Sequence, residues 1–229
     1  MMNSMIFDII TIFPKSFGSY FNESILKRAQ AKKLVQIKIW NLRDFTKDKH
    51  HKVDDKPYGG GPGMVFKIEP IVLTIGSILK SEARITKSET LIILFSPAGK
   101  QFTQKTAREY AKKYNRIILI AGHYEGIDER VKKVFNVLGF KFQELSIGPY
   151  VLTGGELPAM VVIDAVARHI PGVLGKAESL EEKRYGVGVP VYTRPEAFKW
   201  RGKMYKAPKV LLSGNHRQID VFRRKSSKV

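Results

Sequence analysis

The stretch at residues 147–158, IGPYVLTGGELP, has the residue types of a ligand-binding loop. Its adjacent glycines, Gly154 and Gly155, stand directly before a predicted helix, and Pro158 lies near the start of that helix, where proline is well tolerated. Glycines let a ligand approach the backbone closely. Because the loop contains no basic residue, it suits a neutral or cationic ligand better than a phosphate. An adenosine that carries a sulfonium fits this description, as one option among several.

Several common chemistries are missing from the sequence. There is no cysteine, which excludes disulfides, zinc–thiolate sites and thiol nucleophiles. No G-x-G-x-x-G follows a predicted strand, and neither G-x-x-x-x-G-K-[ST] nor G-x-S-x-G occurs. The five histidines lack the spacing of a metal site. The glycine run at residues 59–63 is suited to cradling a phosphate, but a flexible turn explains it at least as well.

The charge of the chain favours a polyanionic partner. Forty Lys and Arg against 21 Asp and Glu leave a formal net charge of +19. A field of this size attracts nucleic acid through phosphate contacts and counterion release, so binding should weaken steeply with salt. From Lys199 to Val229 there are ten Lys or Arg and one acid, Asp220. The alternative is a soluble protein with a merely lysine-rich composition.

No segment suggests a membrane or an export signal. The N-terminus lacks a basic region followed by a long apolar core, so no signal peptide is predicted. The longest apolar candidate, residues 157–170, is interrupted by Asp164, Arg168 and His169. We therefore expect a soluble, cytoplasmic protein without membrane contact.

Predicted strands and helices alternate along the chain. The strands are expected at residues 5–12, 35–40, 90–95, 116–121 and 140–145, and the helices at residues 24–33, 68–81, 103–114, 127–135 and 156–169. This alternation predicts an α/β domain with a mostly parallel sheet. Ligands bind at the carboxyl ends of such strands, which three loops leave at residues 96–99, 122–126 and 147–155. The polar stretch at residues 41–63 is long enough to be functional or disordered.

The 229 residues suffice for one large and one small domain. We predict a ligand-binding domain at residues 1–174, a charged linker at 175–190, and a small, basic, helical domain at 191–229 that binds RNA. The apolar residues 157–163 occupy more than one helical face, which is more than a lone surface helix needs and favours a homodimer.

Six segments carry a resemblance to a known family. They are RDFT at 43–46, VDDKPYGGGPGM at 53–64, GHYEGIDER at 122–130, residues 146–160, YTRPE at 192–196 and LLSGNH at 211–216. In these segments the chain resembles the bacterial tRNA (guanine-N1)-methyltransferases, the TrmD family of SPOUT methyltransferases. The resemblance extends from about Met5 almost to the end of the chain.

The resemblance implies properties that composition does not show. It implies a deep C-terminal trefoil knot, which is rare among proteins, and a homodimer in which each active site is built from both chains. It also implies methyl transfer from S-adenosylmethionine to N1 of the guanine on the 3′ side of the tRNA anticodon. The alternative is a catalytically impaired RNA-binding relative with the same fold, and an assay of methyl transfer to tRNA distinguishes the two.

The resemblance also assigns site residues. Those matched to the cofactor pocket are Leu94, Ser96, Pro97, Gly122, Tyr124, Glu125, Ile147, Gly148, Pro149, Tyr150, Val151, Leu152, Gly154, Gly155 and Pro158. Those matched to the tRNA side are His50, Asp54, Tyr58 and Ser179. Arg168 matches the arginine that stabilises charge on the guanine oxygen. Magnesium is reported for the family, and Glu125 is its candidate ligand here.

Three features depart from the family pattern. Pro149 replaces the usual Asp in the cofactor loop and removes a backbone donor. The C-terminal segment stops at Val229, before the helices with which family members continue, so a weaker grip on tRNA is expected. Lys183 stands at the position of the proposed general base. A lysine with a pKa of about 10.4 cannot accept the proton at neutral pH, so we expect the nearby Glu182 to do so. The alternatives are that Glu181 accepts it, or that Glu178, Glu181 and Glu182 are only a solvated acidic run.

Overall fold

The computed structural model describes residues 4–81, 86–175 and 188–226. The chain forms two compact units, Met1–Leu174 and Gly175–Val229. Among the residues that the structure describes, no helix is long and apolar enough to cross a membrane.

The first unit is built on a five-stranded sheet in the order β2-β1-β6-β5-β7. Its strands are β1 (Met5–Thr11), β2 (Val35–Asn41), β5 (Thr90–Gln101), β6 (Arg116–Ile120) and β7 (Lys141–Ser146). Every neighbouring pair in this sheet is parallel. The predicted α/β fold with a mostly parallel sheet is therefore confirmed, and the carboxyl ends of β5, β6 and β7 meet at one edge.

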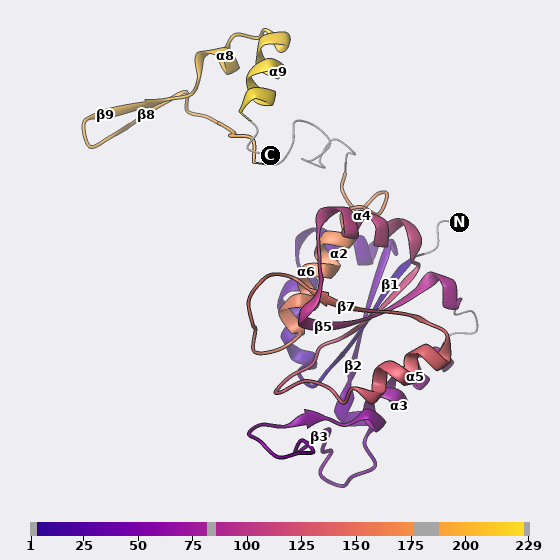
Figure 1. Cartoon of the computed structure of the whole chain (residues 1–229). Coiled ribbons are helices and arrows are strands. Elements are labelled where there is room, and N and C mark those ends of the chain that lie inside the picture. The colour runs from indigo at the N-terminus through magenta and orange to yellow at the C-terminus, as the bar shows by residue number, and fades with distance from the viewer. Residues whose placement is uncertain (1–3, 82–85, 176–187, 227–229) are drawn as a thin grey trace. The chain divides into compact units, whose positions relative to one another are not determined.

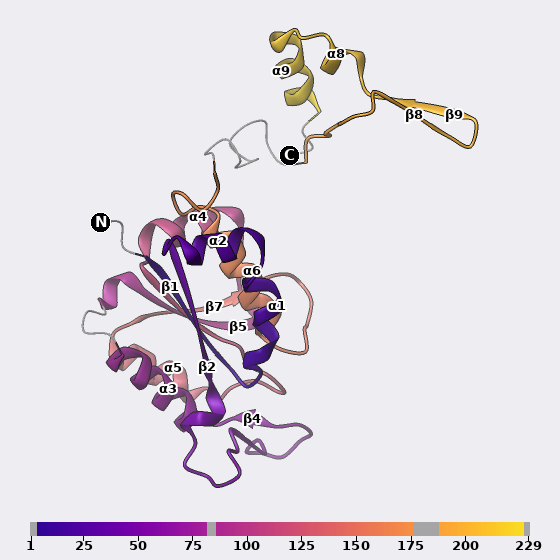
Figure 2. The same ribbon diagram turned by 180° about the vertical axis from the view of Figure 1, so that it is seen from behind.

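Helices cover both faces of this sheet. In β6, Ile117 and Leu119 pack into one core and Ile118 and Ile120 into the other, because successive side chains of a strand point to opposite faces. One face carries α1 (Gly18–Phe21), α2 (Ser24–Ala31), α4 (Gln104–Lys113) and α6 (Glu156–Ala167), and the other carries α3 (Ile68–Lys80) and α5 (Arg130–Leu138) (Figures 1 and 2). Both cores require apolar residues at consecutive strand positions, which explains the unbroken apolar runs in the sequence.

Two predicted boundaries are wrong. The expected loop at residues 96–99 lies within β5, which bulges after Phe95 and pairs again with β7 from Lys100 onward. Helix α5 begins at Arg130 rather than at residue 127. There Ile127 forms a bridge with Phe66, and the Asp128 carboxylate accepts a hydrogen bond from the Arg130 backbone N–H at 2.9 Å.

The polar stretch at residues 41–63 is partly ordered by short elements. Helix η2 (Leu42–Phe45) begins it, and β3 (Asp54–Asp55) pairs with β4 (Val65–Phe66) in a small antiparallel sheet. Val53, next to β3, and Phe66, in β4, are both buried in the core that contains α3 and α5. The other short helices of the unit are η1 (Pro14–Phe17) and η3 (Lys87–Glu89).

The described part of the second unit, residues 188–226, contains a hairpin and two helices. The hairpin is β8 (Ala197–Trp200) with β9 (Lys203–Lys206), and the helices are α8 (Lys209–Leu212) and α9 (His216–Lys225). Only helices were expected here, and the sequence pattern missed the hairpin. Its strands mix aromatic and basic side chains, which do not form the apolar run used to recognise the strands of the first unit.

Candidate active site

A cavity of about 370 Å³ opens where β5, β6 and β7 end. Its walls come from the β5 bulge, from the loop after β6 and from the loop between β7 and α6. The lining residues are Leu94, Phe95, Ser96, Pro97, Gly122, His123, Tyr124, Glu125, Gly126, Ile127, Glu129, Lys132, Glu144, Leu145, Ser146, Ile147, Gly148, Tyr150, Val151, Leu152, Thr153, Gly154, Gly155 and Pro158. The cavity thus lies at the carboxyl edge of the parallel sheet, where α/β folds bind ligands.

The structure brings together the residues that the sequence assigned to the cofactor pocket, with one exception. All of them line the cavity except Pro149, which is exposed and lies outside the described lining. Sequence reasoning missed His123, Lys132 and Glu144. His123 lies inside a matched segment and could have been found there. Lys132 and Glu144 reach the cavity only because α5 packs against β7, which the sequence does not show.

The loop after β7 crosses to the end of β6 at Gly155. The Gly155 N–H donates to the carbonyl oxygen of Gly122 at 2.9 Å, and an antiparallel bridge joins Gly154 to His123. A Cβ atom on Gly155 would lie 2.5 Å from the Cα of Ala121. This position therefore excludes every side chain, because backbone cannot move aside as a flexible side chain can.

A buried hydrogen-bonded group lies beneath the cavity. Glu156, at the first position of α6, accepts a hydrogen bond from the Thr11 hydroxyl at 2.7 Å and shares another with His123 Nε2 at 2.7 Å. Its side chain is nearly buried, and a carboxylate at a helix N-terminus is favoured by the helix dipole. The ring of Phe13 packs edge-on against His123, with the ring centroids 4.9 Å apart. Glu156 thereby joins β1, the cavity wall and α6.

Glu156→Ala should destabilise the first unit by about 1–3 kcal/mol, because it leaves the Thr11 hydroxyl and the His123 ring without their shared acceptor. Glu156→Gln, which keeps a carbonyl oxygen for Thr11, should lose less. Urea unfolding of both variants and the wild type measures these differences in the free energy of unfolding. A wild-type midpoint for Glu156→Ala would contradict the stabilising role of the group.

Charged side chains line one wall of the cavity with an excess of carboxylates. The Lys132 ammonium forms ion pairs with Glu129, at 2.6 Å, and with Glu144, and these two carboxylates raise the pKa of Lys132. Glu125 is the third carboxylate of the lining. Three carboxylates against one ammonium favour a ligand that carries positive charge.

Comparisons with known proteins show the family of the chain. The family model described as tRNA (Guanine-1)-methyltransferase TrmD matches residues 5–229. A relative from Dictyoglomus turgidum, named tRNA (guanine-N(1)-)-methyltransferase, is 52% identical over 223 residues, which are 96% of this chain and 84% of the relative. The chain belongs to the TrmD family. Relatives of the same name from Dehalococcoides mccartyi and Carboxydothermus hydrogenoformans are 51% and 50% identical over 96% of this chain, and the chain covers 84% and 81% of them.

The arginine matched to the TrmD catalytic position lies apart from this cavity. Arg168 caps the C-terminal end of α6, whereas Glu156 and Pro158 at the other end adjoin the cavity. At a rise of ~1.5 Å per residue, the Cα of Arg168 lies about 18 Å along the helix from that of Glu156. Arg168 is absent from the described lining of the cavity in its own chain.

Three of the four residues matched to the tRNA side of TrmD, His50, Asp54 and Tyr58, lie on the stretch at residues 41–63, next to the cavity. Asp54 is on β3 opposite Phe66, and His50 and Tyr58 are exposed. The stretch contacts the cavity wall where the Glu125 N–H donates to the Met64 carbonyl oxygen at 3.0 Å. Ser179, Glu182 and Lys183 lie outside the described residues.

Glu125 is the residue considered for a metal. It is exposed, and its carboxylate folds over Gly63, where an added side chain would collide with it. Within residues 4–81, 86–175 and 188–226, no group of three or more His, Cys, Asp or Glu side chains is placed to hold a metal ion. A metal ion bound at Glu125 would therefore have this carboxylate as its one protein ligand among the described residues.

Proposed function

We propose that the protein transfers a methyl group from S-adenosylmethionine to N1 of the guanine on the 3′ side of the tRNA anticodon. The observation that carries this proposal is the cavity, in which the segments matched to the TrmD cofactor pocket lie together at the carboxyl ends of β5, β6 and β7. Relatives about half identical over 96% of the chain bear the name of this activity.

The cavity suits S-adenosylmethionine in size and chemistry. Its volume of about 370 Å³ lies within the range of small-molecule sites. Leu94, Ile147, Leu152 and Pro158 offer apolar surface to an adenine, and the backbone near Gly155 is open to close approach. The excess of carboxylates favours a molecule with a sulfonium and an ammonium. When bound, this cofactor supplies a methyl group on a sulfonium that is ready for transfer.

The remaining chemistry belongs to groups that act on the guanine. As the N1–methyl bond forms, negative charge grows on the guanine oxygen, and the Arg168 guanidinium stabilises it. The N1 proton needs an acceptor, and we assign Glu182 to this role on the basis of the sequence match. Magnesium, if used, would be held by Glu125 and by oxygen atoms from substrate or water, as magnesium commonly is with few protein ligands.

Supporting evidence for a homodimer comes from α6. Arg168 is about 15 Å along the helix from Pro158, the last residue of α6 that lines the cavity, which is farther than an arginine side chain reaches. We therefore assign the arginine at each cavity to the second chain. The same helix exposes apolar side chains one turn apart, Leu157 at 59% and Val161 at 45%. A partner that packs on this face would bury them.

Val161→Glu should shift the protein toward monomer at micromolar concentration, since a charge would have to be buried in the interface. The matched control is Val137→Glu, because Val137 lies on α5 and is already 87% exposed. Sedimentation velocity of both variants and the wild type gives the masses. A wild type that sediments as a monomer would reject the proposed interface.

The family knot is part of the same proposal. After edge strand β7 the chain passes beyond β5 and is held to the end of β6 by the hydrogen bond from Gly155 to Gly122. Helix α6 then packs near β1, where Thr11 donates to Glu156. A return of this kind across neighbouring strands supports a knotted topology.

Methyl transfer to tRNA tests the proposed function directly. A transcript with guanine 3′ of the anticodon should be methylated, and a transcript with that base changed should not. The tRNA is expected to contact the many Lys and Arg of the second unit through its phosphates. If the protein binds both the cofactor and tRNA but transfers no methyl group, the alternative of a non-catalytic RNA-binding relative is correct.

A further inference from the structure

We propose that the β8–β9 hairpin is a stacking platform for unpaired nucleobases of RNA. The pairing register places Phe198 opposite Tyr205 and Trp200 opposite Lys203. Residues two apart on a strand, and residues directly opposite each other, share a face of a sheet. Three aromatic rings and one lysine therefore occupy one face of a two-stranded ribbon.

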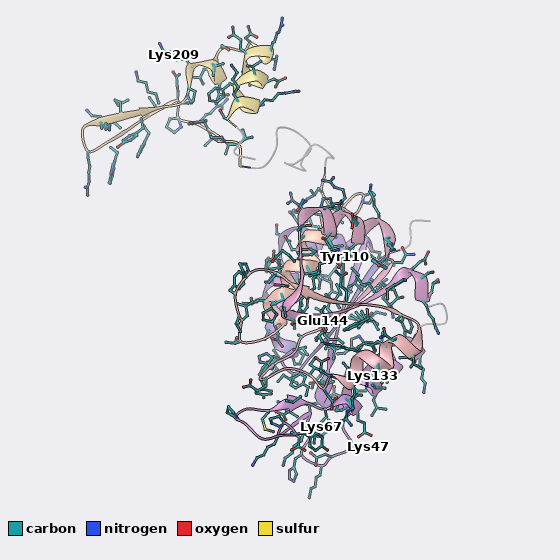
Figure 3. The ribbon with its side chains drawn as sticks, in the orientation of Figure 1. Lys47, Lys67, Tyr110, Lys133, Glu144 and Lys209 are labelled. Atoms are coloured by element: carbon teal, nitrogen blue, oxygen red, sulfur yellow. The ribbon has the colours of Figure 1, made fainter. Side chains whose placement is uncertain are left out.

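These rings are open to solvent. Phe198 and Trp200 are each 56% exposed, and Tyr205 is 51% exposed. Side chains stand out from both sides of the hairpin ribbon (Figure 3). Large aromatic side chains gathered on one exposed face mark a binding surface more often than a structural one. Every nucleobase has a flat π face that can stack on such rings.

Cations lie directly over two of the rings. The Arg201 guanidinium is 5.7 Å from the centre of the Trp200 ring, and the Lys203 ammonium is 5.8 Å from the centre of the Tyr205 ring. This arrangement lets the cations contact phosphates while the rings accept bases, which is how proteins bind single strands. A base that is paired and stacked within a duplex cannot turn outward to stack on such a surface.

The charge of this unit favours a polyanion over a second copy of the chain as the partner of the hairpin. Residues 188–226 contain ten Lys or Arg and two acids, Glu196 and Asp220. A second copy of the chain has a net charge of +19 and would be repelled from a cationic face. A polyanion with exposed bases satisfies both the charge and the rings.

This inference rests on the proposed function in that tRNA supplies the bases, from loops rather than from helical stems. It goes beyond that function by assigning the hairpin to unpaired nucleotides. The basic residues elsewhere in the unit contact phosphates and do not distinguish paired from unpaired RNA.

Tryptophan fluorescence of the full chain reports stacking. The protein has two tryptophans, and the other, Trp40, donates a hydrogen bond to Asp8 in the first unit at 2.8 Å. A single-stranded oligouridylate should quench the wild-type emission, and a blunt RNA duplex of the same length should quench it far less. In Trp200→Phe, the emission that remains belongs to Trp40 and should not respond to either RNA.

Affinity measurements separate stacking from charge. Trp200→Ala and Tyr205→Ala should each weaken binding of the oligouridylate by about tenfold, within the range known for loss of one base–aromatic stack. The slope of affinity against salt should stay unchanged, because no phosphate contact is lost. Trp200→Phe should retain most of the affinity. The control Met204→Ala changes the opposite face of the hairpin, at a side chain that is 48% exposed, and should bind as the wild type does.

Three results would overturn the platform. They are equal quenching by duplex and single strand, unchanged affinity in Trp200→Ala, and aromatic variants that keep RNA affinity but sediment as smaller species, which would make the face a protein contact. The proposed function fails separately. A wild type that shows Trp200 quenching but methylates no tRNA keeps the platform and loses the activity, whereas full methylation with normal RNA binding by Trp200→Ala does the reverse.

Discussion

Arg168→Ala is expected to lower kcat for methyl transfer by about 10²–10³, the usual effect of removing one group that stabilises a developing oxyanion. Affinity for S-adenosylmethionine should be unchanged, because the Arg168 guanidinium is assigned to the guanine oxygen and not to the cofactor. Single-turnover kinetics and calorimetry measure the two quantities. Arg108→Ala, at an exposed position on α4, is the matched control and should behave as the wild type does.

A mixed dimer shows which chain supplies the arginine. The second partner is Gly148→Val, whose added side chain would meet the Tyr150 ring inside the cavity and block the cofactor. If Arg168 acts on the cavity of the other chain, the dimer of Arg168→Ala with Gly148→Val has one intact site and regains activity. If Arg168 acts within its own chain, neither site is intact and the mixed dimer is inactive. That second result would remove the main argument for a shared site.

Gly155→Ala is expected to abolish cofactor binding and to lower the stability of the first unit. The added Cβ would lie 2.5 Å from the Cα of Ala121 and 2.9 Å from the backbone nitrogen of Gly122, so the loop after β6 must shift. Overpacking of this kind costs roughly 1–3 kcal/mol. The loop after β6 and the loop between β7 and α6 both line the cavity, so the same shift changes the shape of the cavity. Calorimetry gives the melting temperature, and titration at a temperature where the variant is folded gives the affinity.

Gly76→Ala serves as the control for this substitution. Gly76 lies within α3, and an added Cβ would meet no atom within 4 Å. Alanine there should stabilise the protein by about 0.5–1 kcal/mol, since it favours the helix, and should leave cofactor affinity unchanged. If Gly155→Ala binds the cofactor as tightly as Gly76→Ala does, the close passage at Gly155 does not shape the pocket.

The sheet was largely predictable from the sequence, but its details at the cavity were not. In β6 every position after Arg116 is apolar, which is typical of strands buried on both faces, and the structure buries these residues in two cores. The β5 bulge was missed because Ser96 and Pro97 look like the end of a strand in isolation. Its pairing from Lys100 onward depends on β7, which comes far later in the chain.

The sequence by itself determined the α/β class, the glycine-rich loop before α6, the excess of positive charge and the family. These depend on the types and spacing of residues close together in the chain. Only the tertiary structure decided that Lys132 meets Glu144, that Glu156 accepts from Thr11 across 145 positions, and that Arg168 lies far from the cavity of its own chain. Such contacts depend on strand order and on packing between distant segments, which local residue patterns do not encode.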